Sequence, residues 1–194
     1  PPPPLFSLIP PPPTTTPDRT LFHYTTLFRS VGDVLGVPDL AQSPRIQKVY
    51  VAPGDLDPYY MFASGGHSGN VYVYGVPSMR HIVTIPVFTP YPATGYGFDD
   101  DSKKMLGNLT WGDAHHPALS ETNGDYDGRW LFVNGNNTPR VARIDLTKFE
   151  TEEILEIPNA SGGHASPMTT QDTRYLVSAT RFSVPIPNKD VPIN

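Results

Sequence analysis

The sequence contains no cysteine, and its 14 Lys and Arg residues are outnumbered by 19 Asp and Glu, which gives a net charge of −5. The missing cysteine excludes disulfides, thiolate metal sites and cysteine nucleophiles within this chain. The basic residues are scattered without a basic stripe, which argues against nucleic acid or an anionic membrane surface as a partner. No apolar run approaches the roughly 20 residues that a membrane-spanning helix requires. The 194 residues are therefore expected to form one domain, or a piece of a larger one, without a membrane span.

Residues 1–30 differ in character from the rest of the chain. The stretch PPPPLFSLIPPPPTTTP holds nine of the 24 prolines, so it is predicted to be extended and unpacked. It lacks the basic and apolar regions of a signal peptide. The next stretch, TLFHYTTLFRS, resembles the translation of a common sequencing adapter, TLFPYTTLFRS, in which one base change gives His23. An ordinary strand is the alternative interpretation.

We therefore expect residues 1–30 to be non-native and disordered, and residues 31–194 to form the natural domain. Deleting the first 30 residues should leave stability and solubility unchanged or improved. The final residues, NKDVPIN, also suggest a cut inside a longer chain.

From Val31 onward the sequence predicts an all-β fold. Short runs of β-branched and aromatic residues are separated by clusters of Gly, Pro, Asn and Asp, which is typical of strands and turns. Sustained helical periodicity is missing, although a short helical turn is expected around DDDSKKML. The predicted strands are KVYVAP, YYMFAS, NVYVYGV, HIVTIPVF, RWLFVNG, RVARIDL, EEILEIP and RYLVSATRF.

A weak internal repeat indicates how these strands are organised. Residues 61–86 align with residues 131–158, and a third copy begins at RYLVSATRFSVPIP. Units of about 40–50 residues are typical of propeller blades, which must stack on neighbours to bury both faces. Because fewer than four blades do not close a ring, the sequence predicts a partial β-propeller of about three blades.

Six histidines are present, and two of them, His115 and His116, are adjacent in WGDAHHPALS. Imidazole is a common ligand for copper and zinc. Neighbours on a strand point to opposite faces, so the pair can converge only at a strand end or a bend, which Pro117 favours. Asp113 could accept the N–H of a ligating imidazole, and the glycines before His164 in SGGHASP allow close backbone approach. Ordinary, partly buried or exposed histidines near a turn are the alternative for the tandem pair.

Other polar motifs support plainer interpretations. His67 in SGGHSGN fits a hairpin turn, and His81 fits an exposed strand position. The acidic run at residues 99–101 could bind a hard cation but is also typical of a solvated loop. NGDYDG has the look of a calcium loop without the terminal Glu, and it is interpreted as a turn between strands.

Several stretches resemble the N-terminal part of nitrous oxide reductase, from about Tyr50 to Asn194. They are GGHSGNVYVYGVPSMR, IPVFTPYPATGYGFDDDSKKML, WGDAHHPALSETNGDYDGRWLFVN, TPRVARIDL and FSVPIPNKDVPI. The resemblance implies a seven-bladed β-propeller with a tetranuclear, sulfide-bridged copper centre held by seven histidines. It also implies a following cupredoxin domain with a binuclear copper centre, structural calcium, a periplasmic location and a head-to-tail homodimer.

By position, the resemblance makes His115 and His116 the tandem copper ligands and His164 a third ligand. The GGHASP context of His164 differs from the His-Gly form of many members. Asp113 matches the acid before the pair, and the remaining four ligands would lie beyond Asn194. The parent enzyme would reduce nitrous oxide to dinitrogen and water with electrons from a small donor protein, such as a cytochrome c or a cupredoxin.

Two rival functions follow from the same sequence. The chain could belong to a non-catalytic propeller that acts as a binding or scaffold module, or to a metal-dependent hydrolytic propeller with carboxylate ligands. The copper hypothesis makes a geometric prediction that separates it from both. The rings of His115, His116 and His164 should lie within roughly 10 Å of one another with Asp113 close by, whereas His67 and His81 should lie outside the group.

Overall fold

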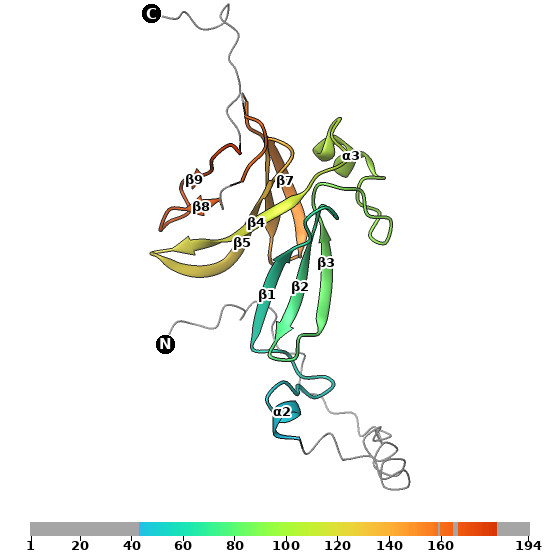
Figure 1. Ribbon diagram of the computed structural model, residues 1–194, viewed down its shortest axis with the longest axis vertical. Helices are drawn as coiled ribbons and strands as arrows, with labels where there is room; N and C mark the ends of the chain where they lie inside the picture. Colours follow the sequence, from blue (N-terminus) through green and yellow to red (C-terminus); the bar gives the residue numbers. More distant parts are fainter. Residues whose placement is uncertain (1–42, 159, 165–166, 182–194) are drawn as a thin grey trace, which may run out of the picture.

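The computed structural model describes residues 43–158, 160–164 and 167–181 (Figure 1). Within these ranges the chain forms three antiparallel sheets and two short helices, so the predicted all-β class is confirmed. The proline-rich and adapter-like segment at residues 1–30 and the stretch FSVPIPNKDVPI lie outside the described residues. Neither helix in the described part is long or apolar enough to cross a bilayer.

The first sheet is a meander of three strands in the order β1-β2-β3. In β2, from Val71 onward, buried residues alternate with half-buried ones, as the period of two in a strand requires. On the buried face Val71 pairs with Ile85 and Val73 pairs with Val83. The strands are β1 (Tyr59–Ser64), β2 (Asn70–Val76) and β3 (His81–Pro86).

The second sheet has four strands in the order β4-β5-β6-β7. The hairpin between the first two of them turns at Asn123 and Gly124, which have φ angles of 53° and 81°. Positive φ at both positions is the requirement of a tight two-residue hairpin, and Asn-Gly meets it at the lowest cost. NGDYDG is thus a turn followed by the start of a strand. The strands are β4 (Ala114–Thr122), β5 (Asp125–Gly135), β6 (Arg140–Asp145) and β7 (Glu150–Glu156).

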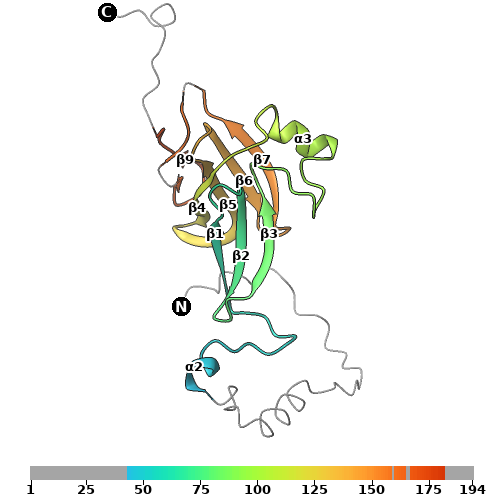
Figure 2. The same cartoon turned by 45° about the vertical axis from the view of Figure 1, so that its right-hand side comes forward.

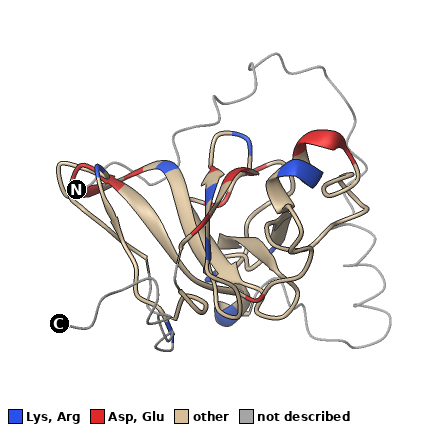
Figure 3. Cartoon of the chain, turned by 90° about the horizontal axis from the view of Figure 1, so that it is seen from above, with Lys and Arg blue, Asp and Glu red and all other residues tan. Residues whose placement is uncertain are grey.

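A third, two-stranded sheet follows, and its first strand contacts β4. It consists of β8 (Met168–Thr169) and β9 (Leu176–Val177), which lies within the predicted strand RYLVSATRF. Further along the same run, residues 179–181 pair with residues 162–164, because His164 N donates to Ala179 O and Arg181 N donates to Gly162 O. The predicted helical turn is confirmed as α3 (Asp100–Leu106). The Asp99 side chain caps it by accepting from Ser102 N at 2.8 Å. In Figure 3, α3 carries acidic residues at its start and basic residues at its end, in keeping with the helix dipole.

The predicted strand KVYVAP is wrong. Its first residues form a turn after the short helix α2 (Pro44–Gln47), and the rest is irregular. Val49 and Tyr50 are exposed, and the segment pairs with no strand among the described residues. A segment with high β propensity forms a strand only when a neighbouring strand can pair with its backbone N–H and C=O groups.

The core lies between the first and second sheets, which pack face to face (Figure 2). The two aligned sequence repeats become β1-β2-β3 and β5-β6-β7, with β4 as an additional strand of the second sheet. This stacking is what neighbouring propeller blades require, while the number of blades stays a prediction. The fully buried apolar side chains of this core are Val71, Val73, Ile85, Val87, Phe88, Ala114, Val133, Ala142 and Ile144.

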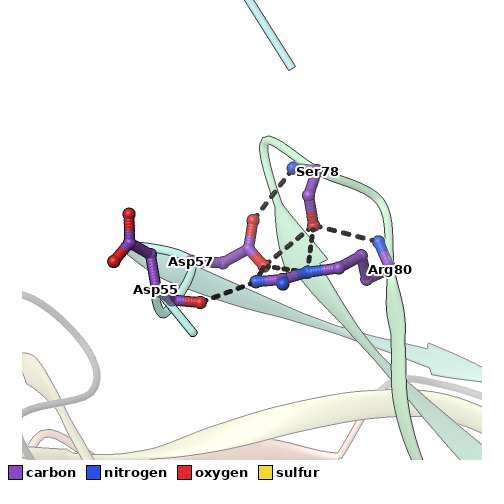
Figure 4. Close-up of polar contacts among 4 residues, drawn as sticks. All are labelled: Asp55, Asp57, Ser78 and Arg80. Carbon is purple, nitrogen blue, oxygen red and sulfur yellow. Dashed lines mark hydrogen bonds and ion pairs between the residues drawn. The ribbon is translucent and has the colours of Figure 1, made fainter. Parts of the chain in front are cut away.

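An ion pair between buried Asp57 and half-exposed Arg80 anchors the segment before β1 to the β2–β3 hairpin (Figure 4). The Asp57 carboxylate, whose side chain is fully buried, accepts hydrogen bonds from Arg80 Nη2 at 2.8 Å and from Ser78 N at 2.9 Å. Arg80 Nη2 also donates to the carbonyl of Asp55. A Cβ at Gly75 would overlap this carboxylate, so glycine is needed where the carboxylate crosses β2.

Candidate metal centre

The two adjacent histidines lie at the start of β4, where the strand is irregular. His115 pairs with Asn134 of β5, but the next pair joins Pro117 to Val133, so His116 is left over as a bulge. Its φ of 42° lies in the left-handed region, which turns its side chain away from the alternating direction of a strand. The ring centroids of His115 and His116 are consequently only 3.9 Å apart. The predicted convergence at a bent strand end is confirmed.

His164 reaches the same place from a distant part of the chain. The preceding residues press against the end of β5, because Gly163 N donates to the carbonyl of Gly135 at 2.7 Å. A Cβ on Gly162 would overlap the carbonyl oxygen of Asn136, and its φ is 83°. The His164 ring centroid lies 5.3 Å from that of His115 and 5.8 Å from that of His116.

The three imidazoles form a group whose geometry suits a metal ion. One nitrogen from each ring lies within 4.8 Å of the others. Nitrogens that bind a single ion at about 2 Å are about 3–4 Å apart, so small side-chain rotations would complete a three-histidine shell. An all-imidazole set fits copper or zinc better than calcium or magnesium, which prefer oxygen. Among the described residues, the group contains no carboxylate ligand of the kind that a hydrolytic propeller would use.

The protonation of His115 also favours metal binding. Burial lowers the pKa of this imidazole, and the neighbouring His116 lowers it further, while Asp113 acts in the opposite direction. The net effect is a pKa below the ordinary value of histidine, so the ring is neutral at neutral pH. A neutral imidazole offers a free lone pair, which a metal requires.

Asp113 is buried just before β4, and its hydrogen bonds go to a neighbouring turn. Its carboxylate accepts from Asn136 Nδ2 at 3.0 Å, and its backbone N–H donates to Asn137 Oδ1 at 2.8 Å. Among the described residues it makes no hydrogen bond to a ring of the triad. It acts on His115 through its charge and anchors the start of β4. A direct orienting role for Asp113 stays a prediction.

The remaining sequence candidates lie outside the triad. His67 is 89% exposed at its side chain, with Nδ1 3.7 Å from Asp113 Oδ2, and His81 packs on β3 against Tyr74. Asp99 is occupied as the cap of α3. In NGDYDG, the Asp127 carboxylate accepts from Ser120 and Thr122 hydroxyls, which gives it a structural role in the hairpin.

Sequence reasoning missed Asn134, the residue opposite His115. Its side chain is completely buried, and neither amide atom has a hydrogen-bond partner in the described part of the chain. The sequence signal that could have identified Asn134 is a polar residue directly after the apolar run WLFV.

Stacked antiparallel sheets with three converging imidazoles define an all-β protein with a candidate copper or zinc site. No protein-family model matches the chain. It is, however, 45% identical over 145 residues to the nitrous-oxide reductase of Pseudomonas fluorescens, covering 73% of this chain and 23% of that protein. It is 42% identical over 146 residues to the enzyme of Stutzerimonas stutzeri, again covering 73% of this chain and 23% of the relative.

A third relative, the nitrous-oxide reductase of Ralstonia nicotianae, is 35% identical over 169 residues, covering 79% of this chain and 26% of that protein. The chain is therefore related to the nitrous-oxide reductases, as its motifs indicated. It spans about a quarter of the length of the curated relatives it matches.

Proposed function

We propose that this chain is part of a nitrous-oxide reductase and supplies His115, His116 and His164 to its copper centre. The observation that carries the proposal is the convergence of three imidazole nitrogens within 4.8 Å, drawn from two distant segments. The similarity to nitrous-oxide reductases supports copper over zinc as the metal. When bound, copper would supply two electrons to nitrous oxide, which with two protons is converted to dinitrogen and water.

The complete enzyme in this proposal has metal ligands, a copper centre and a domain in addition to those that this chain supplies. Three histidines are too few to hold the proposed tetranuclear copper-sulfide centre, so the other four ligands come from the rest of the protein. The proposal includes a binuclear copper centre in a further domain, a small electron-donor protein such as a cytochrome c or a cupredoxin, structural calcium, a homodimer and a periplasmic location. The non-catalytic binding or scaffold module is the alternative.

In the proposed centre, several residues of this chain position the three histidine ligands. The bulge at His116 brings two consecutive imidazoles to one side of β4. Gly162 and Gly163 allow the His164 segment to lie against β5. Asp113 holds the start of β4 to the Asn136 turn, so the tandem pair keeps a fixed position.

Metal titration of the purified chain tests the ligand set. We expect Zn(II), used as a diamagnetic probe, to bind the chain, and His116→Ala or His164→Ala to weaken binding at least about 10-fold by removing one ligand. Isothermal titration calorimetry measures the affinity. His81→Ala is the matched control, because His81 is an exposed strand histidine outside the triad. Equal losses in the control and the triad variants would contradict the assignment, and no binding by the unmodified chain would favour the scaffold alternative.

The isolated chain should not reduce nitrous oxide. It offers three of the seven proposed ligands and no domain for electron entry. The measurement is gas-chromatographic loss of nitrous oxide with a reduced dye and copper-loaded protein. Sustained turnover by the purified chain would show that the proposed division of the enzyme is wrong.

A further inference from the structure

Asn134 is an unusual residue of β5 because its carboxamide is completely buried, with neither Oδ1 nor Nδ2 hydrogen-bonded among the described residues. Leaving a polar group buried without a partner destabilises the folded state. Such groups are rare in folded proteins, so each one calls for a specific explanation.

The location of Asn134 connects it to both ligand segments. It is the direct register partner of His115, so the two side chains lie on the same face of the sheet at close range. On its other side lies Gly163, the residue before His164, where a Cβ would come within 2.7 Å of Asn134 Nδ2. The amide therefore lies next to both His115 and the backbone segment that carries His164.

We propose that Asn134 is a positioning residue of the metal centre, whose Oδ1 accepts the ring N–H of His115 while the other ring nitrogen binds the metal. This inference rests on the proposed function. A metal-bound histidine nearly always donates its second N–H to an acceptor, which fixes its tautomer and ring orientation. No ring nitrogen of His115 is hydrogen-bonded within the described residues, and the Asp113 carboxylate makes its side-chain hydrogen bond to Asn136 instead of to this ring.

Two features of the surrounding sequence agree with this role. Glycine at position 163 leaves room for the amide, since any side chain there would displace Asn134 from its place beside His115. A neutral amide also provides an acceptor at a fully buried position without the large desolvation cost of a carboxylate.

The test uses the full chain with Zn(II) as the only added metal and ¹⁵N-labelled histidine. In the unmodified chain we expect a slowly exchanging ring N–H on His115, observed by ¹H–¹⁵N NMR. Asn134→Leu keeps a similar volume but removes the acceptor, so this signal should disappear and Zn(II) affinity should fall about 10- to 100-fold. Asn134→Asp keeps an acceptor oxygen and should restore the protected N–H. Ile144→Val, a core change on β6, should leave both readouts unchanged.

The outcomes separate this inference from the proposed function. A rapidly exchanging His115 ring N–H in the unmodified, Zn(II)-loaded chain would overturn the role of Asn134 even if a variant failed to fold. Unchanged affinity and an unchanged signal in a folded Asn134→Leu chain would overturn it as well. Failure of the unmodified chain to bind Zn(II) through the triad would instead refute the metal centre itself, and the role of Asn134 with it.

Discussion

At the scale of single residues, backbone conformation determines which side chains can meet. His116 adopts a φ of 42°, a conformation that non-glycine residues seldom use and that costs about 1–2 kcal/mol. The neighbouring sheet imposes it, because Pro117 resumes pairing with Val133 immediately afterwards. Such strain is concentrated at functional sites, and here it converts two consecutive residues into neighbours on one face.

Gly162 provides a test of this backbone control. We expect Gly162→Ala to lower the free energy of unfolding by about 1–3 kcal/mol, because its φ of 83° strains any side chain and the new Cβ would overlap Asn136 O. The displaced His164 should also bind Zn(II) less tightly. Urea unfolding and calorimetric titration measure the two effects.

Gly54→Ala is the matched control for this prediction. Gly54 has a φ of 95° but no heavy atom within 4 Å of an added Cβ, so it isolates backbone strain from steric overlap. We expect a smaller loss of stability and unchanged Zn(II) affinity. If Gly162→Ala behaved like Gly54→Ala in both measurements, the packing of the His164 segment against β5 would not matter for the site.

The sequence was sufficient to predict the three histidines but not their surroundings. His115 and His116 were recognisable as a pair next to a proline, and His164 by its glycines and by the family resemblance. The hydrogen bonds of Asp113 to Asn136 and Asn137 depend on a turn 23 and 24 residues away, which no local pattern encodes. Asn134 was missed because only the strand register places it opposite His115.

At the scale of elements, a small polar network stabilises the β4–β5 hairpin. The buried Ser120 hydroxyl donates to Asp127 and accepts from Trp130 N at 2.8 Å. The same carboxylate accepts from the exposed Thr122 hydroxyl at 2.9 Å. These bonds lie where the register shifts between Leu119 and Glu121, so side chains there replace regular backbone pairing.

Ser120→Ala should therefore destabilise the chain by about 1–3 kcal/mol, since it leaves Trp130 N–H without its acceptor at a half-buried position. Chemical denaturation followed by tryptophan fluorescence measures the change. Thr122→Ala serves as the control because it removes a bond to the same carboxylate at an exposed position, and about 0.5 kcal/mol or less is expected. Equal effects of the two substitutions would show that burial of Ser120 is not what gives the network its strength.

Strand prediction succeeded for runs of β-branched and aromatic residues that have a partner strand. β1, β2, β3 and β6 lie where such runs indicated. β4 was not among the predicted strands, because its sequence AHHPALSET contains a proline and polar residues that resemble a loop. KVYVAP has suitable residues but no partner strand in the described part of the chain.

At the scale of the whole molecule, buried carboxylates couple stability to pH. Burial alone would raise the pKa of Asp57, but hydrogen bonds from Arg80 and Ser78 outweigh it and hold the pKa below its ordinary value. The same balance holds at two other carboxylates, where burial alone would raise the pKa but hydrogen bonds lower it by a larger amount. The hydrogen bonds come from Ser120 to Asp127 and from Thr147 to Asp145. Carboxylates with lowered pKa contribute stability at neutral pH that is lost as acid protonates them in the folded state.

We accordingly expect the free energy of unfolding to be steady near neutral pH and to fall as the pH drops below about 4, the ordinary pKa of an Asp. Urea titrations at a series of pH values measure it. Asp57→Asn should lower stability at neutral pH, because it removes the charge opposite Arg80, and should flatten the acid dependence. A folded Asp57→Asn chain with an unchanged acid dependence would exclude Asp57 as a contributor.

The all-β class and its repeated three-stranded units were predictable because the sequence itself contains a repeat. The alignment of residues 61–86 with residues 131–158 predicted two equivalent three-stranded units, and both are present as sheets that share a core. Their mutual packing could not be derived from either unit alone, since it depends on how side chains of the two buried faces interlock. The blade number depends on sheets that this chain does not contain in its described part.

The sequential pairing of strands has a consequence for the order of folding. Within each sheet every strand pairs with the next one along the chain, so the loops that must close are short and the entropic cost of closing them is small. The histidine triad instead joins residues 116 and 164, across most of the second sheet. The sheets can therefore form before the triad does, so that a metal ion would bind to an already folded scaffold and fix the His164 segment beside β4.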